Sequence, residues 1–162
     1  MKLVYTLGFC ALLFTSCKKT ATSGPSSIQY KANGAQVQIV GGRDTSGRDI
    51  ITGAYYGCYA TKPSGSNIYA VYGSDKIHEV LIGILTTNNI LLETDYGTSS
   101  LSVSFTIDGT GYGINNGDQL TMNISRFSNG TIDATFSGTI SDIHSNKKVI
   151  TDGYLNNIRV YY

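Results

Sequence analysis

Strict two-residue alternation is the feature that most limits the fold of this chain. In Leu101–Ile107 every odd position is apolar and every even position is serine or threonine, and Leu120–Ile124 and Ile132–Ile140 repeat the alternation. Successive side chains of a β-strand point to opposite faces, so each segment has one face for a core and one for water. We therefore expect an all-β chain, folded as an antiparallel β-sandwich or a partly closed barrel.

Turn signals divide residues 28–162 into about nine or ten strands of a single domain. Asn33-Gly34 is the strongest short-hairpin signal, and Lys62–Ser66 is expected to form the whole loop of a second hairpin. Val80–Leu85 is apolar on both faces, which predicts a central strand or one covered on its second side. The 19 glycines and 2 prolines suit strands joined by tight turns.

The first residues are typical of an export signal that ends at a lipid-attachment cysteine. After Lys2, the apolar run Leu3–Phe14 is about a dozen residues long, too short to span a membrane. Ser16-Cys17 resembles the end of a bacterial lipobox, which predicts a signal peptide at 1–16, acylation (palmitate) of Cys17 and a flexible linker over 17–27. The alternative is an ordinary signal peptide that contains a cysteine.

Charge and cysteine content exclude several classes of function. Once Lys2 leaves with the signal, basic and acidic side chains are equal in number, so the basic face that nucleic acid requires is missing. Cys58 is then the one cysteine left in the domain, and a small apolar residue on a strand explains it. Neither His78 nor His144 lies in a metal-binding or catalytic motif, so we expect no cofactor.

Both ends of the chain resemble a known group of proteins. The motif residues are Thr131–Ile140 followed by Val149–Ile158, together with Tyr30–Gly34 and Ser16–Lys19. They are similar to the C-terminal hairpin, the opening strand and the anchor region of small uncharacterised lipoproteins of Bacteroidota. The resemblance implies a lipid-anchored all-β domain on the outer membrane, and it supplies no catalytic residue because that family has no established activity.

Carboxylates are the first candidate for chemistry. Glu93 and Asp95 are two residues apart and would project from the same face of a strand, and Glu79 could join them from a neighbouring strand. Glycosidases use two carboxyl groups about 5–10 Å apart, so a hydrolase is one hypothesis. A solvated strand face explains the same residues.

The glycine-rich stretch Asp108–Asp118 is the second candidate. Its side-chain oxygens could ligate Ca²⁺, although Gln119 stands where a calcium loop of the EF-hand type would place its closing glutamate. A mobile hairpin loop between two strands is the simpler interpretation.

Tyrosines are the third candidate. If Lys62–Ser66 forms the whole loop, Cys58 lies opposite Ala70 and Tyr59 lies opposite Tyr69, with Tyr55 two positions along from this pair. Tyr55, Tyr59 and Tyr69 would then form an outward stripe on which a sugar could stack. The alternative is that these rings stabilise the sheet or lie beneath a loop.

Three functions follow from these observations. The first is a non-enzymatic, lipid-anchored protein of the outer membrane that acts through surface contacts with an envelope protein or other envelope component. The second is a glycan-binding module that uses the tyrosine stripe. The third is a hydrolase built on Glu79, Glu93 or Asp95.

Overall fold

The computed structural model describes residues 24–48, 55–75, 77–86, 90, 92 and 94–162. This part of the chain is built from strands, with one short 3₁₀ turn at Thr98–Ser100. The prediction of an all-β fold is confirmed. The described residues form twelve strands: β1 (Ser27–Ala32), β2 (Ala35–Val40), β3 (Asp44–Arg48), β4 (Tyr55–Thr61), β5 (Ile68–Ser74), β6 (Glu79–Leu85), β7 (Asp95–Tyr96), β8 (Leu101–Ile107), β9 (Thr110–Gly113), β10 (Leu120–Ser128), β11 (Thr131–Ser141) and β12 (Lys147–Tyr161).

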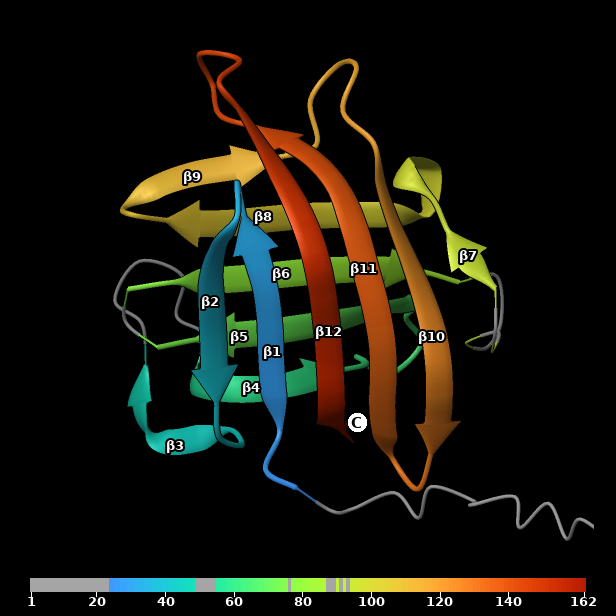
Figure 1. Cartoon of the computed structure of the whole chain (residues 1–162). Coiled ribbons are helices and arrows are strands. Elements are labelled where there is room, and N and C mark those ends of the chain that lie inside the picture. Colours follow the sequence, from blue (N-terminus) through green and yellow to red (C-terminus); the bar gives the residue numbers. More distant parts are fainter. Residues whose placement is uncertain (1–23, 49–54, 76, 87–89, 91, 93) are drawn as a thin grey trace, which may run out of the picture.

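The strands form two layers that run across one another (Figure 1). The front layer has the order β2-β1-β12-β11-β10-β7, and the back layer has the order β4-β5-β6-β8-β9, with β3 paired to β4. Every described pairing is antiparallel except that of β12 with β4, which is parallel. This is the arrangement of an orthogonal β-sandwich.

The two layers are hydrogen-bonded to each other at two corners. At one corner Val160 of β12 pairs with Ala60 of β4, and at the other Ser141 of β11 pairs with Gly113 of β9. The strands between these corners form a ring, but β1, β2, β10 and β7 extend the front layer beyond it. The result fits the expected sandwich with partial closure.

The core lies between the layers and follows the alternation in the sequence. Phe105, Ala134 and Phe136 are buried, whereas Ser104 and Thr135 on the opposite faces of their strands are exposed. The ring of Tyr30 packs edge-on against Phe105 with 5.4 Å between ring centroids and lies 6.2 Å from Phe136. Aromatic contacts across the two layers therefore fill the middle of the sandwich.

A two-residue turn at Asn33-Gly34 closes the hairpin of β1 and β2, as predicted. Both residues have positive φ, 48° and 85°, which matches the right-handed twist of the flanking strands. The Asp108-Gly109 turn has the same left-handed geometry and joins β8 to β9. The stretch Asp108–Asp118 is therefore a turn, a short strand and a second turn, and the expectation of one mobile loop is wrong.

The predicted register of β4 and β5 is also wrong. Tyr59 lies opposite Tyr72, and Cys58 lies opposite Gly73 rather than Ala70. The connection is longer than Lys62–Ser66: Ser66 N–H donates to Pro63 O in a turn, and Ser66 Oγ then accepts from Ile68 N–H. This extra turn moves the pairing along β5, so tyrosines expected to face each other are separated.

β6 lies between β5 and β8, as the apolar run at Val80–Leu85 predicts for a central strand. Its even residues face the core, and its outer face is exposed at Leu81 and Leu85. Leu85 pairs with the exposed Ile68 of β5, so the outer face of the back layer carries a short apolar strip.

Candidate functional site

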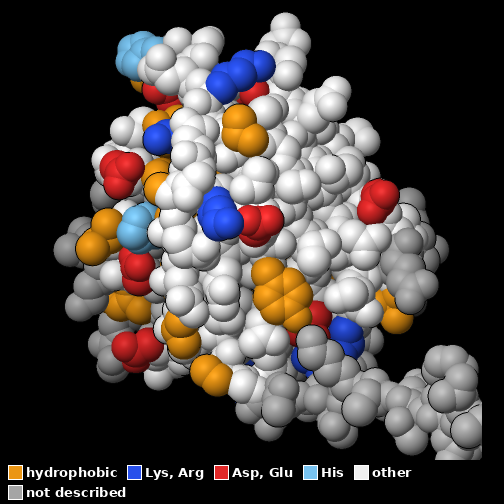
Figure 2. All heavy atoms as spheres, viewed as in Figure 1, with side chains coloured by type: hydrophobic (Ala, Val, Ile, Leu, Met, Phe, Trp, Pro, Cys, Tyr) orange, Lys and Arg blue, Asp and Glu red, His pale blue; other side chains and the backbone are white. Residues whose placement is uncertain are grey.

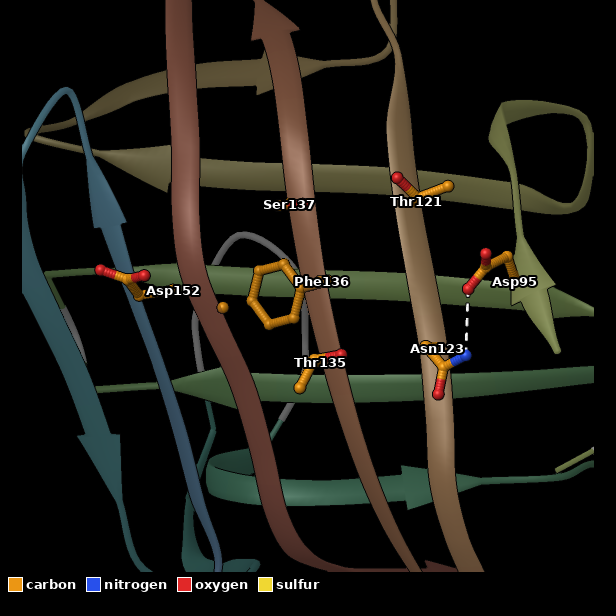
Figure 3. A pocket seen from close by; sticks show the side chains of 8 residues that line it. Asp95, Thr121, Asn123, Thr135, Phe136, Ser137 and Asp152 are labelled. Carbon is orange, nitrogen blue, oxygen red and sulfur yellow. Dashed lines mark hydrogen bonds between the residues drawn. The ribbon is translucent and has the colours of Figure 1, made fainter. Parts of the chain in front are cut away.

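A shallow hollow on the outer face of the front layer is the best-defined candidate site. It has a volume of about 330 Å³ and crosses β12, β11, β10 and β7 (Figure 3). Half of its lining residues are polar and uncharged. The front hollow is formed by Asp95, Thr121, Asn123, Thr135, Phe136, Ser137, Asp152 and Gly153.

The alternation of the sequence places most of these side chains. Residues two apart on a strand share a face, so Thr121 and Asn123 of β10 and Thr135 and Ser137 of β11 all point away from the core. They are the polar residues of segments whose apolar residues are buried beneath them. The floor of the hollow is therefore rigid sheet.

A bulge in β12 adds Asp152 to this face. Gln29 and Lys31 of β1 pair with Tyr154 and Thr151, so Asp152 and Gly153 together stand opposite one residue of β1. Asp152 has a φ of 52° and is exposed, whereas Gly153 is buried against Phe136. The extra residue turns the carboxylate of Asp152 outward.

Hydrogen bonds hold the polar groups at both ends of the front hollow. Asn123 Nδ2 donates to Asp95 Oδ1 at 3.0 Å, the contact dashed in Figure 3. At the other end, Lys31 Nζ lies 2.8 Å from Asp152 Oδ2. These contacts leave acceptor oxygens on both carboxylates and on the Asn123 amide for a ligand.

An aromatic ring lies next to the hollow. Tyr154 of β12 pairs with Thr135 of β11, so it shares the outer face, and 38% of it is exposed. Figure 2 shows that most of this face consists of neutral polar side chains and backbone, with charged side chains scattered over it. The face thus combines a ring with hydroxyl, amide and carboxylate groups.

The two carboxylates of the front hollow are too far apart to act as a glycosidase pair. β12 and β7 are separated by β11 and β10, and neighbouring strands lie about 4.8 Å apart, which puts Asp152 and Asp95 roughly 14 Å from each other. Glycosidases of both kinds use carboxyl groups separated by less than about 10 Å.

The predicted acidic cluster is not assembled by the described residues. Glu79 lines a separate small hollow on the back layer with Tyr72 and Leu81, whereas Asp95 lies on the front layer. Glu93 lies outside the described residues, as does Cys17.

The prediction that Tyr55, Tyr59 and Tyr69 form an exposed stripe is wrong. Tyr59 and Tyr69 are only 4% and 2% exposed, and Tyr55 is half-buried. Tyr59 stacks on Tyr72 with 4.9 Å between ring centroids, whereas Tyr69 faces the core and contacts Phe127. The register described above puts Tyr59 and Tyr69 on opposite faces of the sheet, and on its own face Tyr59 is covered by Arg43 and by the rings of Tyr55, Tyr72 and Tyr161.

Asp118 has a structural environment rather than that of a calcium ligand. It is buried, it accepts hydrogen bonds from the Asn115 N–H at 3.0 Å and the Ser141 hydroxyl at 2.9 Å, and Lys147 Nζ lies 3.6 Å away. Burial raises the pKa of this carboxyl, but these donors and the lysine charge outweigh burial and lower it. Asp108 lies at the other end of β9, and the described residues hold no group of three or more His, Cys, Asp or Glu placed to share a metal ion.

Cys58 is a buried strand residue, as expected. Its Sγ donates to Ile39 O at 3.3 Å, and burial raises the pKa of the thiol to about 12. A thiol that keeps its proton at neutral pH is a poor nucleophile.

Comparison of the chain with models of protein families, with curated proteins and with solved structures found no match in any of the three. In the part of the chain that the structure describes, no helix has the length and apolar character needed to cross a membrane.

Sequence reasoning missed most of the front hollow. The alternation of β10 and β11 predicts that their polar residues share an outward face, and these residues include Thr121, Asn123 and Thr135. It does not predict that they line a hollow. Tyr154 and Asp152 could not be placed, because the bulge that orients both changes the period of β12.

Proposed function

We propose that this chain is a lipid-anchored, non-enzymatic binding protein of the outer membrane, and that its ligand is a glycan held in the front hollow. The observation that carries the proposal is the combination of an exposed ring, Tyr154, with neutral polar side chains on a rigid sheet face. A sugar offers CH groups that stack on a ring and hydroxyls that both donate and accept hydrogen bonds.

The chemistry of the hollow supports a glycan over a charged ligand. Asp95 and Asp152 provide acceptors at the two ends, while Thr121, Thr135 and Ser137 offer hydroxyls between them. The lysine beside Asp152 is already paired with it, so no net positive charge is offered to an anion there. The separation of the carboxylates argues for binding rather than hydrolysis.

The anchor is supported by the N-terminal sequence. The short apolar run and the small residues before Cys17 match a lipoprotein signal, and several acyl chains hold a domain on a membrane essentially permanently. The resemblance to lipoproteins of Bacteroidota favours the outer membrane.

A glycan array probed with the purified chain tests the ligand. We expect binding to be lost in Tyr154→Ala and weakened at least about tenfold in Asn123→Ala, since an alanine at 123 removes a hydrogen-bonding amide beside Asp95. Ser102→Ala is the matched control, because Ser102 is an exposed strand residue on the back layer. Binding that survives in Tyr154→Ala, or that Ser102→Ala reduces equally, would show that the front hollow is not the site.

A further inference from the structure

A second hollow lies at the end of the molecule where the described chain begins. It has a volume of about 520 Å³, and its walls are the segment Gly24–Ser26, the residues that follow β2, the turn between β10 and β11, and the C-terminal end of β12. Its polar side chains are Arg43, Arg159, Asn129, Asn157 and Thr131, with Tyr161 beside them. We call it the arginine hollow.

Tyrosine rings hold Arg43 in place. The guanidinium carbon lies 4.2 Å from the centroid of Tyr55, 5.0 Å from that of Tyr161 and 5.6 Å from that of Tyr59. Arg43 Nε is buried and has no hydrogen-bond partner. The rings attract the cation but accept no strong hydrogen bond from it, so the Nε donor is left without an acceptor.

A second guanidinium group lies close by. Arg159 is exposed on β12, and its guanidinium carbon lies 5.9 Å from the centroid of the same Tyr161 ring. Two cations at one ring repel each other. Both guanidinium groups line the same hollow, so an anion bound there would reduce that repulsion, and a guanidinium fork matches the oxygens of a phosphate.

No acidic side chain is found among the described residues that line the arginine hollow. Asp133 is not among the lining residues, and its carboxylate pairs with Arg126 Nε at 2.6 Å and accepts the Asn157 N–H at 2.6 Å. Asp44 follows Arg43 in the chain and is not among the residues that line the hollow. The net charge of the described lining is positive.

The N-terminal segment is fixed to the wall of this hollow. Asn157 Nδ2 donates to Gly24 O at 2.8 Å, and Ser26 Oγ donates to Asn157 O at 2.7 Å. Six residues lie between Cys17 and Gly24, and the seven steps along an extended chain from one to the other span at most roughly 25 Å. An acylated Cys17 would thus hold the arginine hollow within reach of the membrane surface.

We propose that the arginine hollow binds a phosphate-class oxyanion between the guanidinium groups of Arg43 and Arg159. The phosphate of a lipid headgroup and free phosphate share this chemistry. The lipid source rests on the proposed anchor at Cys17, whereas binding of the anion itself rests on the described residues alone.

Titration calorimetry of the full chain in uncharged detergent, with inorganic phosphate at constant ionic strength, tests the site. We expect Arg159→Gln to weaken phosphate binding about tenfold, since a charge-assisted pair is lost. Lys148→Gln is the matched control, because it removes one positive charge from the same strand, where Lys148 lies over the ring of Tyr112. Arg43→Lys keeps the charge but loses the fork, and it should also weaken binding.

Flotation with vesicles separates the two sources of phosphate. The Cys17→Ser full chain, which has no acyl chains, is mixed with vesicles of phosphatidylcholine alone or with added phosphatidylglycerol. Preference for the anionic vesicles that Arg159→Gln abolishes assigns the site to a headgroup, and calorimetric binding without that preference assigns it to free phosphate. The proposal is overturned if neither probe binds, or if Lys148→Gln has the same effect as Arg159→Gln. Acylation of Cys17 and glycan binding are measured independently, so either can fail while this site stands.

Discussion

At the scale of single residues, close backbone approach explains why glycine stands at position 153. Gly153 lies in the Thr-Asp-Gly stretch of β12, where an added Cβ would meet Phe136 O at 2.2 Å and Phe136 Cδ2 at 2.6 Å. The carbonyl belongs to a paired strand of the front layer and cannot move aside cheaply. The same bulge that brings Gly153 down onto Phe136 turns Asp152 out toward the front hollow.

Gly153→Ala should lower the free energy of unfolding by about 2–3 kcal/mol, the cost of forcing an extra methyl into a packed core. Chemical denaturation measures it. Gly111→Ala is the matched control, because Gly111 is also a strand glycine, is exposed and has nothing within 4 Å of an added Cβ. Equal effects from the two substitutions would mean that the bulge is not packed as described.

At the scale of elements, hydrogen bonds in the connections between strands fix how the strand ends are held together. Asp118, in the segment between β9 and β10, accepts a hydrogen bond from the Ser141 hydroxyl of β11 and forms an ion pair with Lys147 of β12. Asp142 does the same for the following turn, where it accepts from Asn146 and His144. Buried or half-buried carboxylates therefore tie the ends of β9, β11 and β12 together.

Asp118→Asn should destabilise the chain at neutral pH, because the folded pKa of Asp118 is lowered from its ordinary value of 3.8. The unfolded state binds the proton more readily, so the carboxylate contributes stability above pH 3.8, and that contribution is lost as the pH falls through the folded pKa. Denaturation at a series of pH values should show the gap between wild type and Asp118→Asn narrowing below pH 4. Asp108→Asn, on the exposed turn at the other end of β9, serves as the control. A gap that stays constant with pH would contradict the assigned hydrogen bonds.

At the scale of the whole molecule, the two hollows lie on different surfaces. The front hollow opens on the outer face of the front layer, and the arginine hollow lies at the end where β1 begins and β12 finishes (Figure 1). A chain tethered through its N-terminal segment would present the arginine hollow toward the membrane. The front hollow would then stay accessible to a ligand from the side.

Cys17→Ser should release the chain from the membrane fraction or leave it uncleaved, because the thiol is the group that a lipid would modify. Membrane fractionation and mass spectrometry of the mature N-terminus measure this. Cys10→Ser is the control, since Cys10 lies within the proposed signal and should have no effect. A Cys17→Ser chain that matures normally and still partitions into detergent would refute the anchor.

The sequence by itself determined the strands and their buried faces, because successive side chains of a strand point to opposite faces and the sequence therefore alternates between apolar and polar residues. Phe105, Ala134 and Phe136 could be assigned to the core, and Asn33-Gly34 to a hairpin turn, from local pattern alone.

Only the tertiary structure decided how the faces combine into sites. Tyr59 and Tyr69 could not be separated in advance, because one extra turn after Thr61 shifts the register and a shift by an odd number of residues exchanges the faces. The front hollow combines β7 with three later strands, β10, β11 and β12, and the arginine hollow combines four segments that meet at one end. These combinations depend on how strands pair and on how the ends of segments meet, and a local sequence pattern does not specify either.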